Sequence, residues 1–206
     1  MPSEWLRQRK KDQFHRLAKR KGFRSRASFK LLQIAKRHPF IRQGDRVLDL
    51  GAAPGGWLQA ARQLVGADGF VLGVDKEEIS TLPYENVVTL QSDITQGSFE
   101  SQLSGLGYTL FDVIISDLAP DVSGVWEVDQ VRQIDLARHA LKIARSLLKP
   151  GGNMLVKAFQ GADLREFQLE MKSSFQNLRT VKPQASRPES AEIYLLGQGF
   201  LGQVTQ

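Results

Sequence analysis

The most informative stretch of the chain is Val47-Leu-Asp-Leu-Gly-Ala-Ala-Pro-Gly-Gly-Trp57, in which an apolar run leads through a Gly-rich turn into a helical pattern. In an open α/β sheet, such a strand–turn–helix junction is where a nucleotide-like ligand binds. Gly51, Gly55 and Gly56 permit positive φ and let a ligand approach the backbone closely. A turn that requires glycine for its shape alone would show the same pattern. The stretch therefore predicts an α/β fold and leaves the ligand to be decided by the residues around it.

The rest of the chain alternates β-rich runs with amphipathic stretches, which predicts a Rossmann-like α/β fold with a mostly parallel seven-stranded sheet and helices on both faces. The expected strands are residues 46–50, 70–75, 86–91, 111–117, 153–159, 178–182 and 191–196. The expected helices are residues 26–37, 55–65, 127–148 and 163–174, and Lys149-Pro-Gly-Gly152 supplies breakers after the third of them. With 206 residues, 41% of them hydrophobic, we expect one domain over residues 26–206 behind an arm at residues 1–25.

Residues 1–42 are strongly basic. They contain 14 of the 28 Lys and Arg residues but only Glu4 and Asp12 as acids, a net charge of +12, and the rest of the chain carries −6. A basic arm on an acidic body is typical of proteins that bind a polyanion, because Lys and Arg neutralise phosphates and release counterions. A solubilising charge run is the alternative. Interleaved aromatic residues favour a segment that packs on the body over a loose tail: Trp5, Phe14, Phe23 and Phe29.

The composition excludes several classes of site. The chain has no cysteine, which excludes disulfides, thiolate metal sites and cysteine nucleophiles and suits a reducing compartment. Its histidines, His15, His38 and His139, lack metal-ligand spacing, so we expect no metal site. No apolar run reaches the roughly 18 residues that cross a bilayer. No apolar h-region follows the basic start, although an Arg-rich start also resembles an organellar transit peptide. We expect a cytoplasmic monomer without membrane contact.

Aspartates at the predicted strand ends indicate a cationic nucleoside ligand. The Gly-rich turn matches neither the dinucleotide nor the P-loop pattern, and no Lys follows it to hold a β-phosphate, so a pyrophosphate ligand is disfavoured. Asp75 lies 24 residues after Gly51, where a carboxylate accepts both hydroxyls of a ribose. Asp93 is in reach of an adenine amino group, and Asp49 and Asp117 can hold the amino end of the ligand. Each aspartate alone could be a turn residue or a helix cap. Together they fit S-adenosylmethionine.

A family resemblance rests on four blocks of sequence: Ser25-Arg-Ala-Ser-Phe-Lys30, Gly51-Ala-Ala-Pro-Gly-Gly-Trp57, Ser116-Asp-Leu-Ala-Pro120 followed by Ser123-Gly124, and Val156-Lys-Ala-Phe-Gln-Gly161. Through these blocks, which occur in family order, the chain resembles the FtsJ/RrmJ family of RNA 2′-O-methyltransferases from about residue 24 to residue 196. One departure is Ala158, where relatives often have Val after the second Lys, and this changes only packing.

The resemblance implies an S-adenosylmethionine-dependent methyltransferase fold and specific site residues. A catalytic Lys-Asp-Lys-Glu tetrad falls on Lys30, Asp117, Lys157 and Glu192, with Glu189 as a neighbouring candidate for the last position. The cofactor, which would leave as S-adenosylhomocysteine, is expected to contact Asp49, Gly51, Pro54, Gly55, Gly56, Trp57, Asp75, Asp93 and Asp117. RNA phosphates are expected to contact Arg7, Arg9, Lys10, Lys11, Arg24 and Arg26.

The implied chemistry explains the residue types of the tetrad. Methyl transfer to a ribose hydroxyl is an in-line displacement, so the oxygen must be aligned with the methyl group and must lose its proton. Lys157 is the candidate base, because a second cation at Lys30 would lower its pKa. Alternatively, Lys157 stays charged and steers the hydroxyl. The alternative for Lys157 is an ordinary surface ion pair. This is disfavoured because Lys157 directly follows the apolar run Met154-Leu-Val156, which is a poor place for a solvent-exposed side chain.

Several targets fit the same chemistry. Members of the family that the chain resembles act on a uridine of large-subunit ribosomal RNA, on tRNA or on mRNA caps. The compact length favours the ribosomal group, with the RNA or the large subunit as partner. A small-molecule methyltransferase would not need the basic arm. A non-catalytic RNA-binding or ribosome-assembly factor is a third alternative, because it could keep the fold without the activity. Methyl transfer to RNA by the intact protein distinguishes the enzyme from such a factor.

Overall fold

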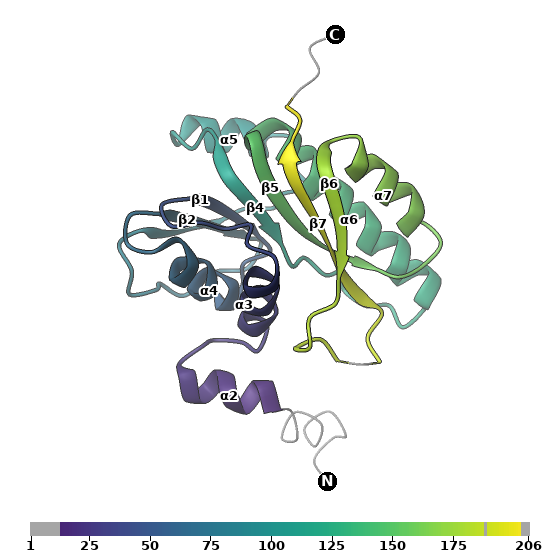
Figure 1. The fold of residues 1–206 in the computed structure, drawn as a ribbon, viewed down its shortest axis with the longest axis horizontal. Helices are drawn as coiled ribbons and strands as arrows, with labels where there is room; N and C mark the ends of the chain where they lie inside the picture. The colour runs from purple at the N-terminus through teal and green to yellow at the C-terminus, as the bar shows by residue number, and fades with distance from the viewer. Residues whose placement is uncertain (1–12, 188, 203–206) are drawn as a thin grey trace.

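The computed structural model describes residues 13–187 and 189–202, which form an α/β fold around one sheet (Figure 1). The strands are β1 (Arg46–Leu50), β2 (Phe70–Asp75), β3 (Val87–Gln91), β4 (Phe111–Ser116), β5 (Leu148–Phe159), β6 (Phe175–Val181) and β7 (Glu192–Phe200). The helices are α2 (Gln13–Lys21), α3 (Ser28–Arg37), α4 (Gly56–Val65), α5 (Phe99–Gly105), α6 (Trp126–Leu147) and α7 (Leu164–Lys172).

The sheet has seven strands in the order β3-β2-β1-β4-β5-β7-β6. The pairs among β1 to β5 are parallel, whereas β7 runs antiparallel to both of its neighbours, β5 and β6. The order reverses direction at β1, so the loops after β1 and β4 diverge and leave room at the carboxyl ends of the strands. This edge of the sheet is therefore where a ligand is expected to bind.

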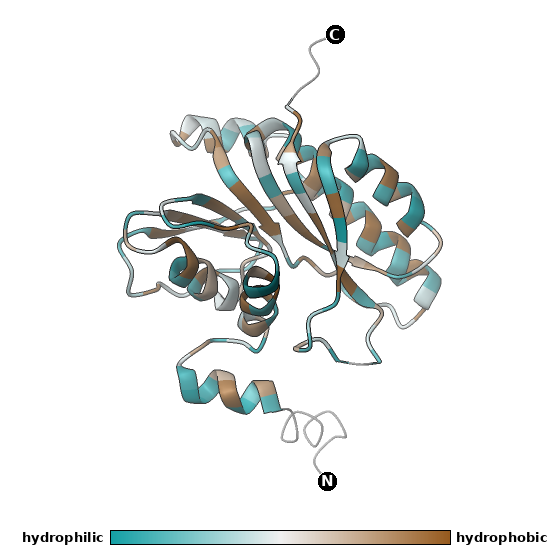
Figure 2. Ribbon diagram, in the orientation of Figure 1, coloured by the Kyte–Doolittle hydropathy of each residue, from teal (hydrophilic) through white to brown (hydrophobic). Residues whose placement is uncertain are grey.

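Helices cover both faces of the sheet, as the sequence predicted. One face packs against α5, α6 and α7 through a core that includes Phe99, Ile134 and Phe167. The other face packs against α3 and α4 through Leu31 and Leu58. In Figure 2 hydrophobic residues concentrate on the central strands and hydrophilic residues on the helices, and the central strands β1, β2 and β4 are almost fully buried. The edge strand β6 is largely exposed.

Most predicted elements are confirmed, and the differences have local causes. The expected strands 46–50 and 70–75 match β1 and β2, and the helix expected at 127–148 is α6. Two helices, α2 and α5, were not predicted, because α2 is dominated by charge and α5 has only seven residues. The breakers Lys149-Pro-Gly-Gly152 do end α6, but the chain enters β5 at once rather than at residue 153.

Helix α2 packs on the body of the protein through a small apolar cluster. Phe14 and Phe23 each contact the ring of Phe29, with ring centroids 5.8 and 5.4 Å apart, and Ala18 is buried beneath them. The expectation that these aromatic residues dock the basic segment is confirmed, while Trp5 lies outside the described residues. Over the described part of the chain, no helix combines the length and the apolar character needed to cross a membrane.

Replacing Gly73 with Ala should destabilise the fold, because β2 approaches α4 closely at this position. A Cβ atom there would lie 2.6 and 2.8 Å from the Cδ atoms of Leu58 and 3.0 Å from Ala52 Cβ. Both neighbours are buried, so we expect a loss of about 1–3 kcal/mol in the free energy of unfolding. Urea denaturation measures it. Gly97→Ala is the control, since nothing lies within 4 Å of its Cβ position, and equal effects of the two substitutions would contradict this account of the packing.

Candidate active site

A cavity of about 610 Å³ opens at the carboxyl ends of the strands. Its lining includes the turn after β1, the ends of β2 and β4, the loop after β3 and part of α6. Carboxylates and apolar side chains share the wall, among them Asp75, Asp93, Ile94, Asp117, Leu118 and Leu136. This is the volume and the mixed lining of a small-molecule site.

The turn after β1 follows the backbone conformation that the glycines allow. Gly51 has φ +83°, and a Cβ there would lie 2.7 Å from Leu118. Gly55 has φ +104° and forms the N-cap of α4. The Asp75 carboxylate accepts hydrogen bonds from the backbone N–H of Ala53 at 2.9 Å and of Glu77 at 2.9 Å. Asp75 therefore joins the Gly-rich turn to the end of β2 while it lines the cavity.

The structure brings only part of the predicted cofactor set to the cavity wall. Gly51, Asp75, Asp93 and Asp117 line it. The residues outside the lining are Asp49, Pro54, Gly55, Gly56 and Trp57.

Two of these residues pack against α3 instead. The buried indole of Trp57 donates from Nε1 to the Ala27 carbonyl at 2.8 Å and packs on Tyr194. The Gly56 carbonyl accepts from Ser28 Oγ at 2.9 Å. Position 56 has no room for a Cβ atom because the hydroxyl groups of Ser25 and Ser28 approach it. Trp57 links α3 to Tyr194, which hydrogen-bonds to Asp117.

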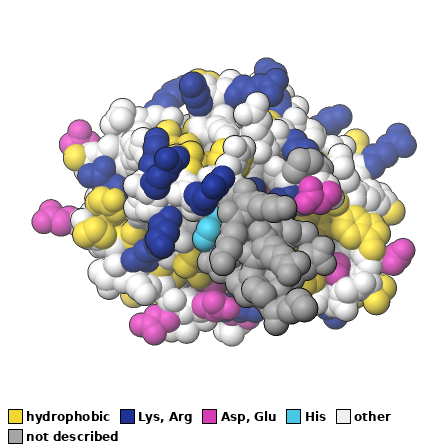
Figure 3. Space-filling model, turned by 90° about the horizontal axis from the view of Figure 1, so that it is seen from below, with side chains coloured by type: hydrophobic (Ala, Val, Ile, Leu, Met, Phe, Trp, Pro, Cys, Tyr) yellow, Lys and Arg dark blue, Asp and Glu magenta, His cyan; other side chains and the backbone are white. Residues whose placement is uncertain are grey.

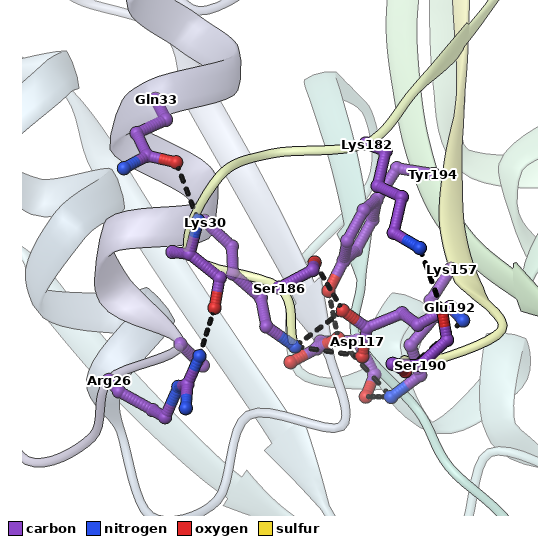
Figure 4. A network of polar contacts seen from close by, with 12 residues as sticks. Arg26, Lys30, Gln33, Asp117, Lys157, Lys182, Ser186, Ser190, Glu192 and Tyr194 are labelled. Atoms are coloured by element: carbon purple, nitrogen blue, oxygen red, sulfur yellow. Dashed lines mark hydrogen bonds and ion pairs between the residues drawn. The ribbon is translucent and has the colours of Figure 1, made fainter. Parts of the chain in front are cut away.

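The four residues of the predicted tetrad lie together (Figure 4). Lys30 Nζ from α3 lies 2.7 and 2.8 Å from the two carboxylate oxygens of Glu192 in β7. Lys157 Nζ from β5 lies 3.2 Å from Asp117 Oδ1 and donates to the Asp117 carbonyl at 2.7 Å. Tyr194 Oη donates to the same carboxylate at 2.7 Å. Elements that are distant in sequence therefore supply one cluster of charges.

The register of the sheet explains why these side chains share one face. Lys157 pairs with Tyr194 across β5 and β7, and Phe159 pairs with Glu192. Directly opposed residues point to the same side, and alternate residues along a strand do so too. Glu192, not Glu189, is therefore the carboxylate that meets Lys30. Ser186 Oγ also donates to Glu192 Oε1 at 2.8 Å and helps to hold it.

The electrostatics of the cluster are those of paired charges with little access to water. The side chains of Lys157 and Asp117 are only 6% and 16% exposed. Burial acts to raise the pKa of Asp117, but the ammonium groups of Lys157 and Lys30 outweigh it, so this pKa lies below the usual range of an aspartate. Burial, together with the charge of Asp117, holds the pKa of Tyr194 well above its usual range. Asp117 is thus an anion that both fixes Lys157 and faces the cavity.

The predicted phosphate contacts fall into two groups. Arg7, Arg9, Lys10 and Lys11 lie outside the described residues. The Arg24 guanidinium donates to the carbonyls of Pro54, Ser80 and Thr81 at 3.0, 2.6 and 2.7 Å. Arg26 donates to the Ala185 carbonyl. Both arginines therefore fasten loops around the site, because their guanidinium groups reach backbone oxygens there.

Sequence reasoning overlooked the cations of α2. Arg16, Lys19, Arg20 and Lys21 are exposed on this helix, whereas Ala18 is buried. Figure 3, which views the molecule from the α2 side, shows Lys and Arg side chains gathered on this surface. The signal was present in the sequence as cations spaced around apolar residues at helical intervals. Among the described residues, no group of His, Cys, Asp and Glu side chains could hold a metal ion.

Taken together, the fold and the site define a class of protein. The sheet order with one reversed strand, the Gly-rich turn after β1 and the carboxylates after β2 and β3 define a Rossmann-like methyltransferase fold. A lysine–carboxylate cluster lies beside the cavity of this fold.

Comparison with known proteins gives the family. The model of the FtsJ-like methyltransferase family matches residues 23–200, and the chain belongs to this family. It is 46% identical over 200 residues to ribosomal RNA large subunit methyltransferase E of Methanococcus maripaludis, covering 97% of this chain and 77% of the relative. The protein of the same description from Methanothermobacter thermautotrophicus is 43% identical over 203 residues, covering 98% and 96%.

A solved structure agrees with this assignment. A Plasmodium falciparum protein described as a ribosomal RNA methyltransferase superposes with a TM-score of 0.77 at 26% identity, covering 88% of this chain and 100% of that one. The chain is therefore a methyltransferase.

Asp49 is a buried carboxyl group without a partner. It is fully buried in β1, and neither of its side-chain oxygens has a hydrogen-bond partner. Burial, and then the charges of Asp117 and Asp75, raise its pKa well above the usual range. A raised pKa means that the folded state binds the proton of Asp49 more tightly than the unfolded state does. The protonated carboxyl group therefore adds to the free energy of unfolding fully below the unfolded pKa, and this addition is lost as the pH rises through the folded pKa.

Asp49→Asn should therefore remove the loss of stability that the buried carboxyl group causes as the pH rises. Relative to the wild type, the variant should gain free energy of unfolding as the pH rises from about 4, the pKa of an unfolded aspartate, through the raised pKa of the folded protein. Urea denaturation at a series of pH values measures the difference. The exposed Asp68→Asn is the matched control, and a difference between wild type and Asp49→Asn that does not vary with pH would contradict the prediction.

Proposed function

We propose that this methyltransferase transfers a methyl group from S-adenosylmethionine to a ribose 2′-hydroxyl of RNA, and that its target is a uridine of large-subunit ribosomal RNA. The observation that carries the proposal is the buried Lys30–Glu192 and Lys157–Asp117 cluster, whose Asp117 also lines the cavity. The descriptions of the relatives, which name ribosomal RNA of the large subunit, support the choice of RNA.

The cavity suits S-adenosylmethionine by its chemistry. Asp75 stands where ribose hydroxyls need acceptors, and Asp93 stands after β3 where an exocyclic amine would donate. Ile94 and Leu136 offer apolar contacts for an adenine ring. Asp117 supplies a negative charge for a cationic ligand. The cofactor would supply a methyl group activated by a sulfonium and would leave as S-adenosylhomocysteine.

The chain's own residues would position the ribose hydroxyl and manage its proton. Lys157 is held from two sides, by the carboxylate and the carbonyl of Asp117, so its Nζ atom has a defined position. Such fixed geometry is worth several kcal/mol when it aligns the reacting oxygen. In one role the neutral amine of Lys157 accepts the hydroxyl proton. In the other role the ammonium group donates to the oxygen and steers its lone pair.

Lys30 would act as the second cation of the site. Its contact with Glu192 keeps it beside the cluster, and its charge acts on Asp117 together with that of Lys157. Glu192 and Asp117 thus each hold one ammonium group. Low exposure of Lys157 keeps water from competing for the proton.

The basic surface would bind the RNA. The exposed cations of α2 continue the basic segment, in which we place phosphate contacts at Arg7, Arg9, Lys10 and Lys11. Phosphate contacts of this kind are independent of sequence and position the RNA. We further propose that residues 1–25 act as an RNA-binding arm on a single domain at residues 26–206, and that the protein works as a monomer in the cytoplasm on ribosomal RNA or the large subunit.

The proposal is tested by mapping ribose methylation across total RNA with and without the gene. We expect one uridine of large-subunit ribosomal RNA to lose its 2′-O-methyl group in the absence of the gene. An unchanged methylation map would overturn the proposal, and loss of a methyl group in a tRNA would move the target to that RNA.

Lys157→Ala should abolish methyl transfer to RNA from tritiated S-adenosylmethionine, because no group remains to orient the hydroxyl or accept its proton. Loss of a general base alone typically costs about 10²- to 10⁴-fold. RNA binding, measured by filter retention, should stay within a few-fold of the wild type. Lys142→Ala on the outer surface of α6 is the control. Lys157→Arg, which cannot act as a base at neutral pH, should be inactive if the lysine accepts the proton and partly active if it only steers.

A triple Arg16→Ala, Lys19→Ala, Arg20→Ala variant should bind RNA more weakly and with a lower dependence on salt. Each lost phosphate contact should reduce the slope of log K against log salt by about 0.7–0.9. Fluorescence anisotropy at several salt concentrations measures both effects. The matched control removes three exposed cations of α6 and α7: Lys142, Arg165 and Lys172. Equal losses in the two triple variants would refute a specific role for α2.

A further inference from the structure

An exposed pair of aromatic rings lies beside the catalytic cluster and takes no part in the chemistry described above. Trp126, the first residue of α6, stacks on Phe159, the last residue of β5, with ring centroids 5.8 Å apart and an angle of 18° between the planes. Trp126 remains 45% exposed. Phe159 is half-buried, so part of the pair is open to solvent and can stack on one further planar group.

The register of the sheet places this pair at the rim of the cluster. Phe159 follows Lys157 by two residues on the same strand and is paired with Glu192 across β7. Residues two apart on a strand point to the same face and are separated by roughly 7 Å. This is a separation that one nucleoside can span, with its ribose at Lys157 and its base at the aromatic pair.

The surroundings hold Trp126 in place. The buried Asp129 carboxylate accepts hydrogen bonds from Ser123 N and Ser123 Oγ, both at 2.7 Å, and from Gly124 N at 3.2 Å. These contacts tie the loop after β4 to the first turn of α6. Gln130 packs against Gly161, where a Cβ would lie 1.9 Å from Gln130 Oε1. The start of α6 is thereby fastened to the segment that follows Phe159.

We propose that the Trp126–Phe159 pair is the stacking platform for the base of the nucleotide that is methylated, and that the substrate presents this nucleotide unpaired. The inference rests on the proposed function. Base–aromatic stacking is a common mode of binding single-stranded nucleic acid and tolerates different bases. A base inside an A-form duplex is stacked on both sides and cannot reach such a platform, whereas one in a loop can be splayed out.

A protein partner is the other occupant to consider, because Val122 and Val125 beside the pair are 77% and 52% exposed. RNA is favoured by position, since Phe159 shares a strand face with Lys157 and lies opposite Glu192. RNA is favoured also by charge, since the cations gathered on α2 can hold an RNA backbone while one base reaches the rings.

The test is a thermodynamic cycle that combines Trp126→Ala with removal of the base. The substrate is an RNA hairpin of large-subunit ribosomal sequence with one unpaired uridine in its loop. The comparison substrate carries an abasic ribonucleotide there, with its 2′-hydroxyl intact. On the uridine hairpin, Trp126→Ala should raise KM and Kd for RNA about 5- to 100-fold. On the abasic hairpin the variant and the wild type should agree within about twofold, because the wild type has already lost the stacking contact.

Three controls make the outcome specific. Trp126→Phe should keep most of the affinity, since it retains an aromatic face. Leu169→Ala removes another exposed apolar side chain, from α7, and should leave KM and Kd unchanged. Binding of S-adenosylmethionine, measured by calorimetry, should be the same in all variants and so report an intact fold.

The opposing outcomes are distinct. If Trp126→Ala weakens both hairpins equally, or neither, the platform for the target base is wrong, and a role in folding or in protein docking replaces it. A third hairpin keeps the uridine but lacks the base next to it. If the variant and the wild type agree only on that hairpin, the rings bind the neighbouring base and the assignment to the target nucleotide is wrong. If the wild type labels neither the hairpins nor purified large ribosomal subunits, the proposed function fails, while the Kd cycle on the same hairpins still decides whether the rings bind a base.

Discussion

The contact between Lys157 and Asp117 is the interaction on which the site depends. It joins β5 to the end of β4 through a side-chain ion pair and a hydrogen bond to the carbonyl. Asp117 in turn accepts from Tyr194 and faces the cavity. A buried ammonium group without its carboxylate would cost several kcal/mol. The same contact therefore joins the centre of the sheet and fixes the position of Lys157 Nζ, for which we propose a role at the ribose hydroxyl.

The reversed strand β7 makes this arrangement possible. Because β7 lies antiparallel between β5 and β6, its first residue, Glu192, reaches the edge where the parallel strands end. Glu192 then meets Lys30, which α3 presents from the same side of the sheet. A cluster of two cations and two anions results, and each charge is paired, so that the group can be buried without a net charge.

The loops around the cavity are held by backbone acceptors and donors more than by side-chain bulk. Arg24 ties the turn after β1 to the segment at residues 80 and 81, and Asp75 ties the same turn to β2. Asp129 accepts a hydrogen bond from Ser123 N and so ties the loop after β4 to the start of α6. Fixed loops preorganise a ligand site, since less entropy is lost when the ligand binds. The aromatic pair of Trp126 and Phe159 lies at the junction of two such fastened segments.

Local patterns in the sequence determined the strands, most of the helices and the Gly-rich turn, because hydrophobic period and turn chemistry act over a few neighbouring residues. The four residues predicted as a tetrad came instead from the resemblance of short sequence blocks to the family. Local patterns did not determine that Gly56 and Trp57 pack on α3, that Arg24 and Arg26 fasten loops, or that Asp49 has no partner. The pairing of Lys30 with Glu192, across 162 positions, and the stacking of Trp126 on Phe159 were likewise decided only by the tertiary structure. Contacts of this kind depend on strand order and register, and no short stretch of sequence carries that information.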